Sequence, residues 1–299
     1  MGPKQFGKLI AALRREQRDE QNHECTQACL AKLVGVSEQI IGKIERGEKV
    51  TYEADLLVNL ANAFRLSSRE RKEFFLAAVG LDERDIPRPA HTPEQILNSL
   101  IAIMTTTVLP ALIVDAYDDV VAINSFARTL FDFTDELQRE APHLVGGFNI
   151  MRVVFSKKSK YRDALAKEQR ERCITQNLQF FKTITLPHRA SPYFAYLLKG
   201  FRKDKDMSLF NAYYAESMHG DSEDFYIEDE VLIFNHEKLG RIRCYSPSME
   251  AVTAAGALYL LIYIPADLQT LRVFSQLAEA CRCGTGVVRL AGWPHKPAA

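Results

Sequence analysis

The 299-residue sequence has no excess of charge of either sign, because 38 lysines and arginines are balanced by 38 aspartates and glutamates. This balance excludes a histone-like polycation, so any contact with nucleic acid must depend on where the charges are placed. Long hydrophobic runs are missing as well. The longest, residues 251–266, contains Thr253 and is followed by Asp267, so it falls short of a membrane span. No apolar signal region follows Met1, and we therefore expect a cytoplasmic protein that does not contact a membrane.

Cysteine is scarce, and its six occurrences form no regular framework: they are Cys25, Cys29, Cys173, Cys244, Cys281 and Cys283. A reducing compartment would keep them as thiols. Neither the first two nor the last two supply four ligands at the spacing of a zinc site. We therefore predict free thiols and no bound metal, with a redox or metal sensor as the alternative.

Signatures of catalysis are also absent. The sequence has no glycine-rich phosphate loop, no His-Glu-x-x-His and no Gly-x-Ser-x-Gly. Its acidic clusters, at Asp118-Asp119 and at residues 228–230, are expected in turns, where carboxylates are normally solvated. We therefore predict a protein that is not an enzyme, with no catalytic residues and no obligatory cofactor.

The composition that is present is that of an ordinary globular protein, with 47% hydrophobic and 25% charged residues. Over residues 1–80 the apolar side chains recur only at helical spacing, and Gly35 and Gly47 separate periodic segments. Ser67 followed by Glu70 has the pattern of a helix-capping box. The pattern predicts an all-α domain over residues 1–80.

The composition changes after this region. Residues 81–93 combine charges with three prolines, which is typical of a stiff linker, and Thr92 and Pro93 have the pattern of a new helix start. Beyond residue 94, helical and strand periods mix. Predicted strands are 112–114, 120–123, 230–234, 241–245 and 256–264, and predicted helices are 125–133 and 267–281. Residues 149–186 and 191–216 are long segments biased toward helix. The pattern predicts an α+β domain over 94–283 with an antiparallel sheet, followed by a loosely held tail over 284–299.

Residues 26–47 have the pattern of two short helices joined by a tight turn. Thr26 can cap the first helix, and Gly35 can end it in a left-handed conformation. Ser37 can cap the second helix, and Gly47 ends it. The side chains predicted to face inward are Leu30, Ala31 and Leu33 on the first helix, Val36 in the turn, and Ile40 or Ile41 with Ile44 on the second. This is the arrangement of a helix-turn-helix.

The second helix would direct polar side chains away from the core: Glu38, Gln39, Lys43 and Arg46. These residue types suit base recognition, because glutamine bonds adenine edges, lysine and arginine reach guanine or phosphate, and glutamate accepts from cytosine. Gln27 and Ser37, at the starts of the two helices, are predicted to fix phosphates. Together with the four side chains above, they form the predicted DNA-binding site.

These positions resemble the Xre-type helix-turn-helix family, whose hallmark is Ser/Thr-Gln, then Ala, then Gly-Val-Ser, then Ile-x-x-Ile-Glu-x-Gly. The matching residues are Thr26-Gln27, Ala31, Gly35-Val36-Ser37, Ile41, Ile44-Glu45 and Gly47. The resemblance implies sequence-specific binding to double-stranded DNA. The stretch 14–25 is longer and more acidic than the family's usual turn, so we expect an extended first helix.

The charge of this region leaves an alternative, which is a helical hairpin without a DNA partner. Residues 1–80 carry 13 basic and 11 acidic side chains, a surplus of only 2. With so small a positive surplus, one subunit is expected to bind the phosphates of DNA with only modest affinity. We therefore expect a homodimer that contacts two half-sites.

A second resemblance covers residues 94–280. Residues 109–115, 120–127 and 130–131 are similar to the opening of the ligand-binding domain of MmyB-like transcription regulators, and residues 148–155 to that domain's helix with Asn, Arg and Phe at fixed spacing. The resemblance implies a PAS-like sensor that holds an apolar small molecule, a fatty acid being the family's suggested ligand.

For the ligand site we select aromatic and methionine side chains, with two polar side chains that can anchor a head group. They are Phe131, Met151, Phe155 and Phe194, with Arg152 and Tyr245 as anchors. Ordinary core packing is the alternative for each ring, and a surface position with a packed stem is the alternative for Arg152. Asn124 is expected to cap the helix that follows the hairpin.

The sequence thus predicts a dimeric transcriptional regulator that binds DNA and responds to a small apolar ligand. The first alternative is a DNA-binding regulator whose second domain only dimerises or docks another protein. The second alternative is an antitoxin-like or enzyme-linked module.

Overall fold

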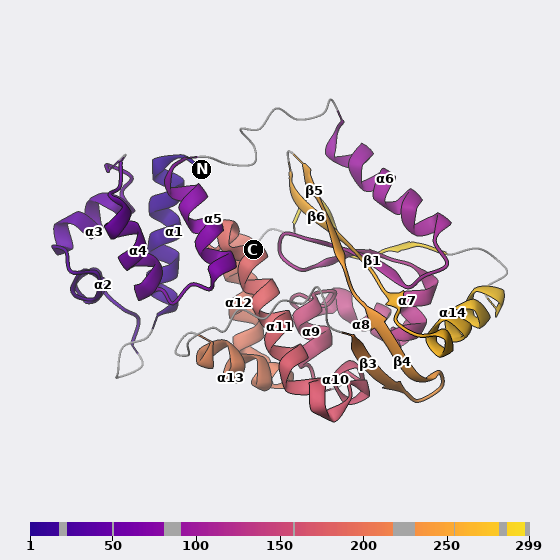
Figure 1. Cartoon of the computed structure of the whole chain (residues 1–299). Helices are drawn as coiled ribbons and strands as arrows, with labels where there is room; N and C mark the ends of the chain where they lie inside the picture. Colours follow the sequence, from indigo (N-terminus) through magenta and orange to yellow (C-terminus); the bar gives the residue numbers. More distant parts are fainter. Residues whose placement is uncertain are drawn as a thin grey trace. The chain divides into compact units, whose positions relative to one another are not determined.

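The computed structural model describes residues 1–17, 23–49, 51–80, 91–157, 159–217, 231–253, 255–280 and 286–296 (Figure 1). The chain forms two compact units. The first contains residues 1–87, 182–195 and 212–224, and the second contains residues 88–181, 196–211 and 225–299. A helical part therefore precedes an α+β part, as predicted.

Some of the predicted features lie outside the described residues. They are the linker as far as residue 90, the acidic cluster at 228–230, and the cysteines at 281 and 283.

The N-terminal part of the first unit consists of helices. They are α1 (Pro3–Glu16), α2 (Gln27–Val34), α3 (Glu38–Glu45), α4 (Ala54–Ala63) and α5 (Ser68–Ala78). Of these, α2, α3 and α5 begin directly after their predicted cap residues. The Thr26 hydroxyl accepts from the N–H of Cys29 at 3.1 Å, and Ser67 and Glu70 form a capping box. Gly35 ends α2 with a φ of 77°, a left-handed conformation in which glycine has no Cβ to clash. These predicted helix ends are confirmed.

The core of this helical part is apolar and depends on a close crossing of α1 and α3. A Cβ at Gly7 would lie 2.4 Å from the carbonyl oxygen of Ile44, so only glycine fits there. Leu33, which was predicted to face inward, is 61% exposed, because Val34 takes the inward position on α2 at 5%. An eight-residue helix presents a single stripe to a core, and Val34 lies on it. The predicted extension of the first helix is also wrong, since α1 ends at Glu16.

The first unit is completed by a segment from far along the chain. The short 3-10 helix η3 (Leu186–His188) adds the fully buried Leu186 to the same apolar core. Arg189 follows and donates from Nη1 to Glu16 Oε2 at 2.7 Å and from Nη2 to Glu70 Oε1 at 3.0 Å. The predicted domain boundaries did not assign residues 182–195 to this unit.

The resulting ion cluster is buried. Arg189 is 3% exposed, Glu16 9% and Glu70 1%. The Tyr214 hydroxyl donates to Glu16 at 2.8 Å, and Lys182 Nζ lies 4.0 Å from Glu70 Oε2. Burial opposes the charged form of Arg189, but the two carboxylates outweigh it and raise the pKa of the guanidinium. The cluster therefore pairs two buried anions of α1 and α5 with two cations of the later segment.

Replacing Arg189 by methionine keeps most of the side chain's length and removes its charge. The two glutamates then lose their main partner, and breaking a buried ion pair costs about 3–5 kcal/mol. We expect Arg189→Met to lower the free energy of unfolding in urea by about this amount. Arg69→Met, at an exposed arginine of α5, should change it by no more than about 0.5 kcal/mol. Equal stability of the two variants would contradict this account.

The second unit contains two antiparallel sheets. Their strands are β1 (Ala111–Asp115), β2 (Val120–Ile123), β3 (Leu232–His236), β4 (Gly240–Tyr245), β5 (Ser248–Thr253), β6 (Gly256–Ile262), β7 (Ile264–Pro265) and β8 (Val288–Arg289). The larger sheet has the order β5-β6-β1-β2-β8, and the smaller has the order β3-β4-β7. The predicted hairpin is β1–β2, and the apolar run predicted to be a central strand is β6, which pairs with β1 and β5. Strands β5 and β8 lie outside the predicted strands.

Helices connect and flank these sheets. They are α6 (Pro93–Thr106), α7 (Ser125–Leu130), α8 (Asp135–Glu140), α9 (Ile150–Phe155), α10 (Tyr161–Ala164), α11 (Lys167–Thr185), α12 (Pro192–Lys203), α13 (Ser208–Glu216) and α14 (Leu268–Ala280). The predicted caps are confirmed: the Thr92 side chain accepts from the N–H of Gln95 at 3.3 Å, and Asn124 Oδ1 accepts from the N–H of Ala127 at 2.9 Å. Within the described ranges, no helix is long and apolar enough to cross a bilayer.

The end of the chain is held more firmly than predicted. Val288 pairs with Ile123 as part of the β8–β2 ladder, and Trp293 packs against the apolar core of the larger sheet. Lys296 forms ion pairs with Asp115 and, at 2.7 Å, with Asp119. Residues 286–296 therefore belong to the fold.

The β1–β2 turn buries its carboxylates, so the prediction that Asp118-Asp119 is solvated is wrong. Asp115, Asp118 and Asp119 are 1%, 1% and 2% exposed. Burial raises the pKa of Asp115 to about 6 and the pKa of Asp118 well above its usual range. Burial disfavours the charge of Lys296, but Asp115 and Asp119 outweigh it and raise the pKa of the ammonium. Among the described residues, Asp118 Oδ2 has no hydrogen-bond partner.

Asp118→Asn should stabilise the protein at alkaline pH. Asparagine has the same shape and tolerates the left-handed φ of 64° at this position. Because the folded-state pKa of Asp118 lies above 3.8, the parent protein loses stability as the pH rises above about 4, whereas the amide does not titrate. We therefore expect a gain in the free energy of unfolding at pH 8 that vanishes near pH 4.

Urea unfolding at pH 4, 6 and 8 measures this difference. Asp163→Asn is the control, because the Asp163 side chain is 68% exposed and its removal should leave the pH dependence unchanged. An Asp118→Asn protein less stable than the parent at pH 8 is the outcome that contradicts the account.

Candidate functional site

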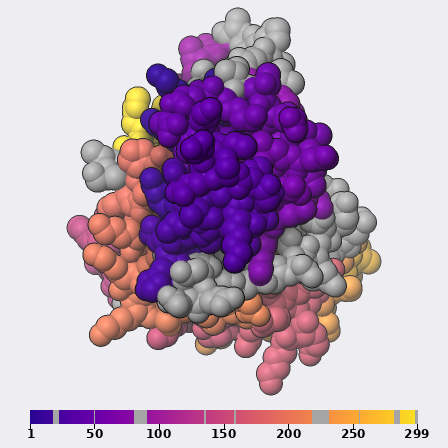
Figure 2. All heavy atoms as spheres, turned by 90° about the vertical axis from the view of Figure 1, so that its left-hand side faces the viewer, coloured from indigo at the N-terminus to yellow at the C-terminus, as the bar shows by residue number. Residues whose placement is uncertain are grey.

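The exposed face of α3 carries the polar side chains predicted for it. Glu38, Gln39, Lys43 and Arg46 are exposed, whereas Ile41 and Ile44 on the opposite side are fully buried, as predicted. Figure 2 views the first unit from the side on which α2 and α3 lie, and its indigo and violet atoms form one continuous face. Such a face suits insertion into the groove of a large partner better than enclosure of a small molecule.

Glu45, at the end of α3, links three helices. Its carboxylate accepts from Arg14 of α1 at 2.6 Å and 3.2 Å, and from the amide of Gln27 of α2 at 2.6 Å. Arg14 also donates to the carbonyl of Cys25 at 2.7 Å, directly before α2. Bidentate charge-assisted pairs are strongly directional. Glu45 therefore fixes the relative positions of α1, α2 and α3, and its role is to position the exposed face of α3.

The two predicted phosphate contacts differ in their surroundings. Gln27 is half-buried, and one amide hydrogen is used by Glu45, which leaves the second for another acceptor. Ser37 occupies the predicted cap position of α3 and is exposed, but its hydroxyl makes no capping hydrogen bond. The Ser37 hydroxyl can therefore donate a hydrogen bond to a phosphate oxygen.

Arg46 forms a bidentate pair with Glu48, at 2.6 Å and 3.0 Å. The hydrogen bond raises the pKa of Arg46 and lowers the pKa of Glu48. The two side chains are 59% and 50% exposed, so water screens the pair and a phosphate can compete with Glu48 for the guanidinium.

A disulfide joins Cys25 and Cys29 across the start of α2, so the prediction of free thiols is wrong for this pair. Their Cα atoms lie 5.5 Å apart. Cys25 precedes the cap residue and Cys29 lies in the first helical turn, which brings the two side chains together; the spacing of four residues was the signal for it. Cys173 and Cys244 are free, as predicted. Both are buried, and burial raises the pKa of Cys244 to about 12.

The six predicted ligand residues do not meet at one cavity. Met151 and Phe155 are fully buried on α9. Between them, Arg152 donates to Asp204 Oδ2 at 2.8 Å, with side chains 10% and 26% exposed. Arg152 is therefore already paired with an anion of its own unit.

The remaining predicted ligand residues lie on other elements. Phe194 belongs to the first unit, where the Arg189 guanidinium lies 5.7 Å from its ring centroid. Tyr245, at the end of β4, is 38% exposed and pairs with Ile264 of β7. Phe131 lines a pocket of the second unit.

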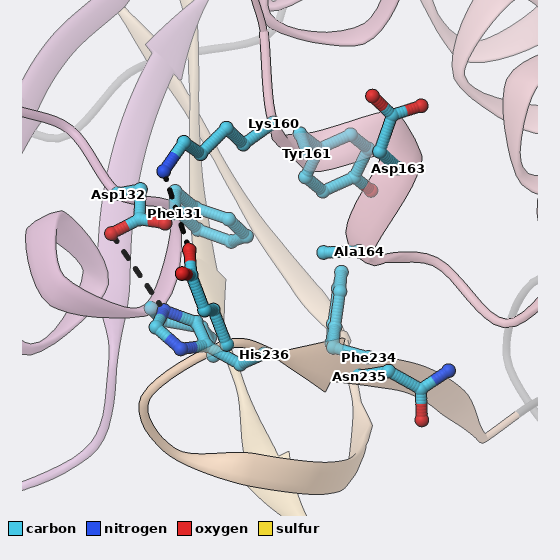
Figure 3. A pocket seen from close by; sticks show the side chains of 11 residues that line it. Phe131, Asp132, Lys160, Tyr161, Asp163, Ala164, Phe234, Asn235 and His236 are labelled. Atoms are coloured by element: carbon cyan, nitrogen blue, oxygen red, sulfur yellow. Dashed lines mark hydrogen bonds and ion pairs between the residues drawn. The ribbon is translucent and has the colours of Figure 1, made fainter.

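This pocket has a volume of about 200 Å³ and lies in the second unit, between the end of α7, the helix α10 and the end of β3 (Figure 3). Phe131, Tyr161 and Phe234 form its apolar wall, with ring centroids 5.7 to 6.2 Å apart. Burial raises the pKa of Tyr161 well above its usual range, so its phenol stays neutral. Lys160 and Glu237 face each other at 3.5 Å on the rim.

His236 and Asp132 form the polar side of the pocket. His236 Nδ1 accepts from the backbone N–H groups of Lys238 and Leu239 at 3.1 and 3.2 Å, so its hydrogen is on Nε2, which donates to the carbonyl of Thr129 at 3.1 Å. Asp132, held at a φ of 47°, has a carboxylate oxygen 4.0 Å from Nε2.

No family model matches the chain, and no curated protein matches it. In the part of the chain that the structure describes, no three His, Cys, Asp or Glu side chains are placed to hold a metal ion. The functional interpretation therefore depends on the face of α3 and on the pocket beside Phe131.

Proposed function

We propose that the protein is a sequence-specific DNA-binding transcriptional regulator in which α3 is the recognition helix. The observation that carries this proposal is the exposed polar face of α3, held in place by the bonds of Glu45 to α1 and α2. A helix that enters the major groove needs outward polar side chains and a fixed angle to its neighbours. The second unit acts as the sensor domain.

In this proposal, some side chains of α3 contact bases and others contact phosphates. Gln39 and Lys43 are exposed on successive turns and suit adenine and guanine edges. Glu38 can accept from cytosine, and Arg46 can reach a phosphate once it leaves Glu48. Ser37 and Gln27 supply a hydroxyl and an amide hydrogen to the backbone at the helix starts, which fixes the register.

Replacing Gln39 and Lys43 together by alanine should abolish most of the sequence preference. Each good base contact contributes about 1–3 kcal/mol, so we expect a loss of at least tenfold in affinity for an operator selected from random duplexes by the parent protein. Thermal stability should stay unchanged, because both side chains are exposed. Gel-shift titrations at one fixed salt concentration measure the affinity.

A matched control removes the same functional groups elsewhere. Asn98→Ala with Lys199→Ala takes one side-chain amide and one positive charge from exposed positions of the second unit, and it should bind the operator as the parent does. Selection that enriches no sequence, or equal binding by the two double variants, would refute the role of α3.

The second unit has two candidate roles, which are ligand sensing and dimerisation. Sensing is favoured by the pocket with its apolar wall and polar side. A dimer is favoured by the small positive surplus of residues 1–80, because one unit can neutralise few phosphates. Leu268 and Leu271 of α14, 72% and 46% exposed, offer apolar surface for a contact between two copies.

We expect a homodimer held through the second unit. Sedimentation equilibrium of the full chain should give the mass of two chains at micromolar concentration. Leu268→Glu with Leu271→Glu should shift the equilibrium to monomers, whereas Leu33→Glu, at an exposed leucine of the first unit, should not. A monomer for the parent protein, both alone and with DNA, is the result that would overturn the dimer.

A further inference from the structure

The wall of the pocket beside Phe131 is aromatic and closely packed. The rings of Phe131, Tyr161 and Phe234 contact one another, and a fourth ring, Tyr263, lies 5.0 Å from Phe131. Aromatic faces carry partial negative charge and attract cations, most strongly where water is excluded. Phe234 is 2% exposed and Tyr161 9%, so little water reaches these rings.

Asp132 adds a full negative charge to this wall. Among the described residues, its carboxylate has no lysine or arginine as an ion-pair partner, and the Nε2 of His236, which lies 3.1 Å from the carbonyl oxygen of Thr129, is 4.0 Å from one carboxylate oxygen. Its side chain is 23% exposed, so water screens the charge only in part. The backbone supports the arrangement, because a left-handed residue directly after Phe131 turns the carboxylate toward His236 (Figure 3).

The other charges of the lining leave Asp132 as the carboxylate that can balance a bound cation. Lys160 is the single lysine or arginine that lines the pocket, and it extends toward Glu237 (Figure 3). The carboxylate of Asp163 points away from the rings and lies 3.8 Å from Arg162.

The volume sets the size of the occupant. A pocket of about 200 Å³ lies below the ~300–1,000 Å³ of sites for drug-sized ligands. A long acyl chain does not fit within it, and its carboxylate would face Asp132. A compact molecule with a positive charge and an apolar body satisfies both the rings and the carboxylate.

We propose that this pocket binds a compact organic ammonium ion, with its charge against Asp132 and its alkyl groups on Phe131 and Phe234. The inference deepens the sensing role and rests on that part of the proposed function. Binding is measured without DNA, so its failure and the failure of DNA recognition are distinguishable.

The experiment uses the full chain and three probes in isothermal titration calorimetry at low salt. Choline carries a trimethylammonium group, 3,3-dimethyl-1-butanol is its neutral analogue of the same shape, and laurate represents a fatty acid. We expect choline to bind with a dissociation constant at or below about 1 mM, and the neutral analogue at least tenfold more weakly, because it lacks the charge. Laurate should not bind in the pocket.

Three variants assign the site. Asp132→Asn keeps the shape and tolerates the left-handed backbone, and it should weaken choline binding at least tenfold. Asp163→Asn is the matched control and should change the dissociation constant by less than twofold, because this exposed carboxylate points away from the rings. Lys160→Met removes a competing cation and should tighten binding severalfold.

Each result decides the proposal. Choline binding that depends on Asp132 and on the positive charge supports it. Equal binding of choline and the neutral analogue, or unchanged binding by Asp132→Asn, overturns it. Laurate binding in the absence of choline binding assigns a fatty acid and also overturns it. If none of the probes binds, the ammonium site is wrong and the second unit is better assigned to dimerisation.

Discussion

Two carboxylates buried in the first unit need a cation, and that cation comes from residue 189. An unpaired charge in an apolar interior is strongly destabilising, so Glu16 and Glu70 would force their helices apart without Arg189. Glu16 lies on the same turn of α1 as Arg14, which binds Glu45 of α3. The turn of α1 that supports the candidate recognition helix is therefore fixed from both sides. The first 80 residues alone would lack the contacts of Arg189 with Glu16 and Glu70.

Local features of the fold could be predicted from the sequence because their causes are local. Thr26, Ser67, Thr92 and Asn124 each bond a backbone N–H three residues away, and each begins the helix expected of it. The exposed face of α3 follows from the same helical period. The helical period of the apolar residues did not show whether Leu33 or Val34 faces the core. The two residues are adjacent in the sequence, and both lie near the edge of the apolar stripe.

Features that depend on distant residues could not be predicted. Lys296 pairs with Asp115 and Asp119 of the β1–β2 turn from about 180 residues further along the chain, and nothing near these carboxylates in the sequence indicates that. The prediction that six side chains form one ligand site was wrong for a related reason. Phenylalanines in a core and in a pocket have the same side chain, and only the tertiary packing separates Phe155, in the core, from Phe131, at the pocket.

The short strand β8 covers the outer edge of β2, and this has a consequence for solubility. An uncovered edge presents unpaired N–H and C=O groups that recruit strands from other molecules. All four residues of β2 are buried apolar residues without a charge to block such pairing. Arg289 and the anchored Trp293 and Lys296 hold β8 in place, so proteolytic loss of these few residues would convert a closed sheet edge into a template for aggregation.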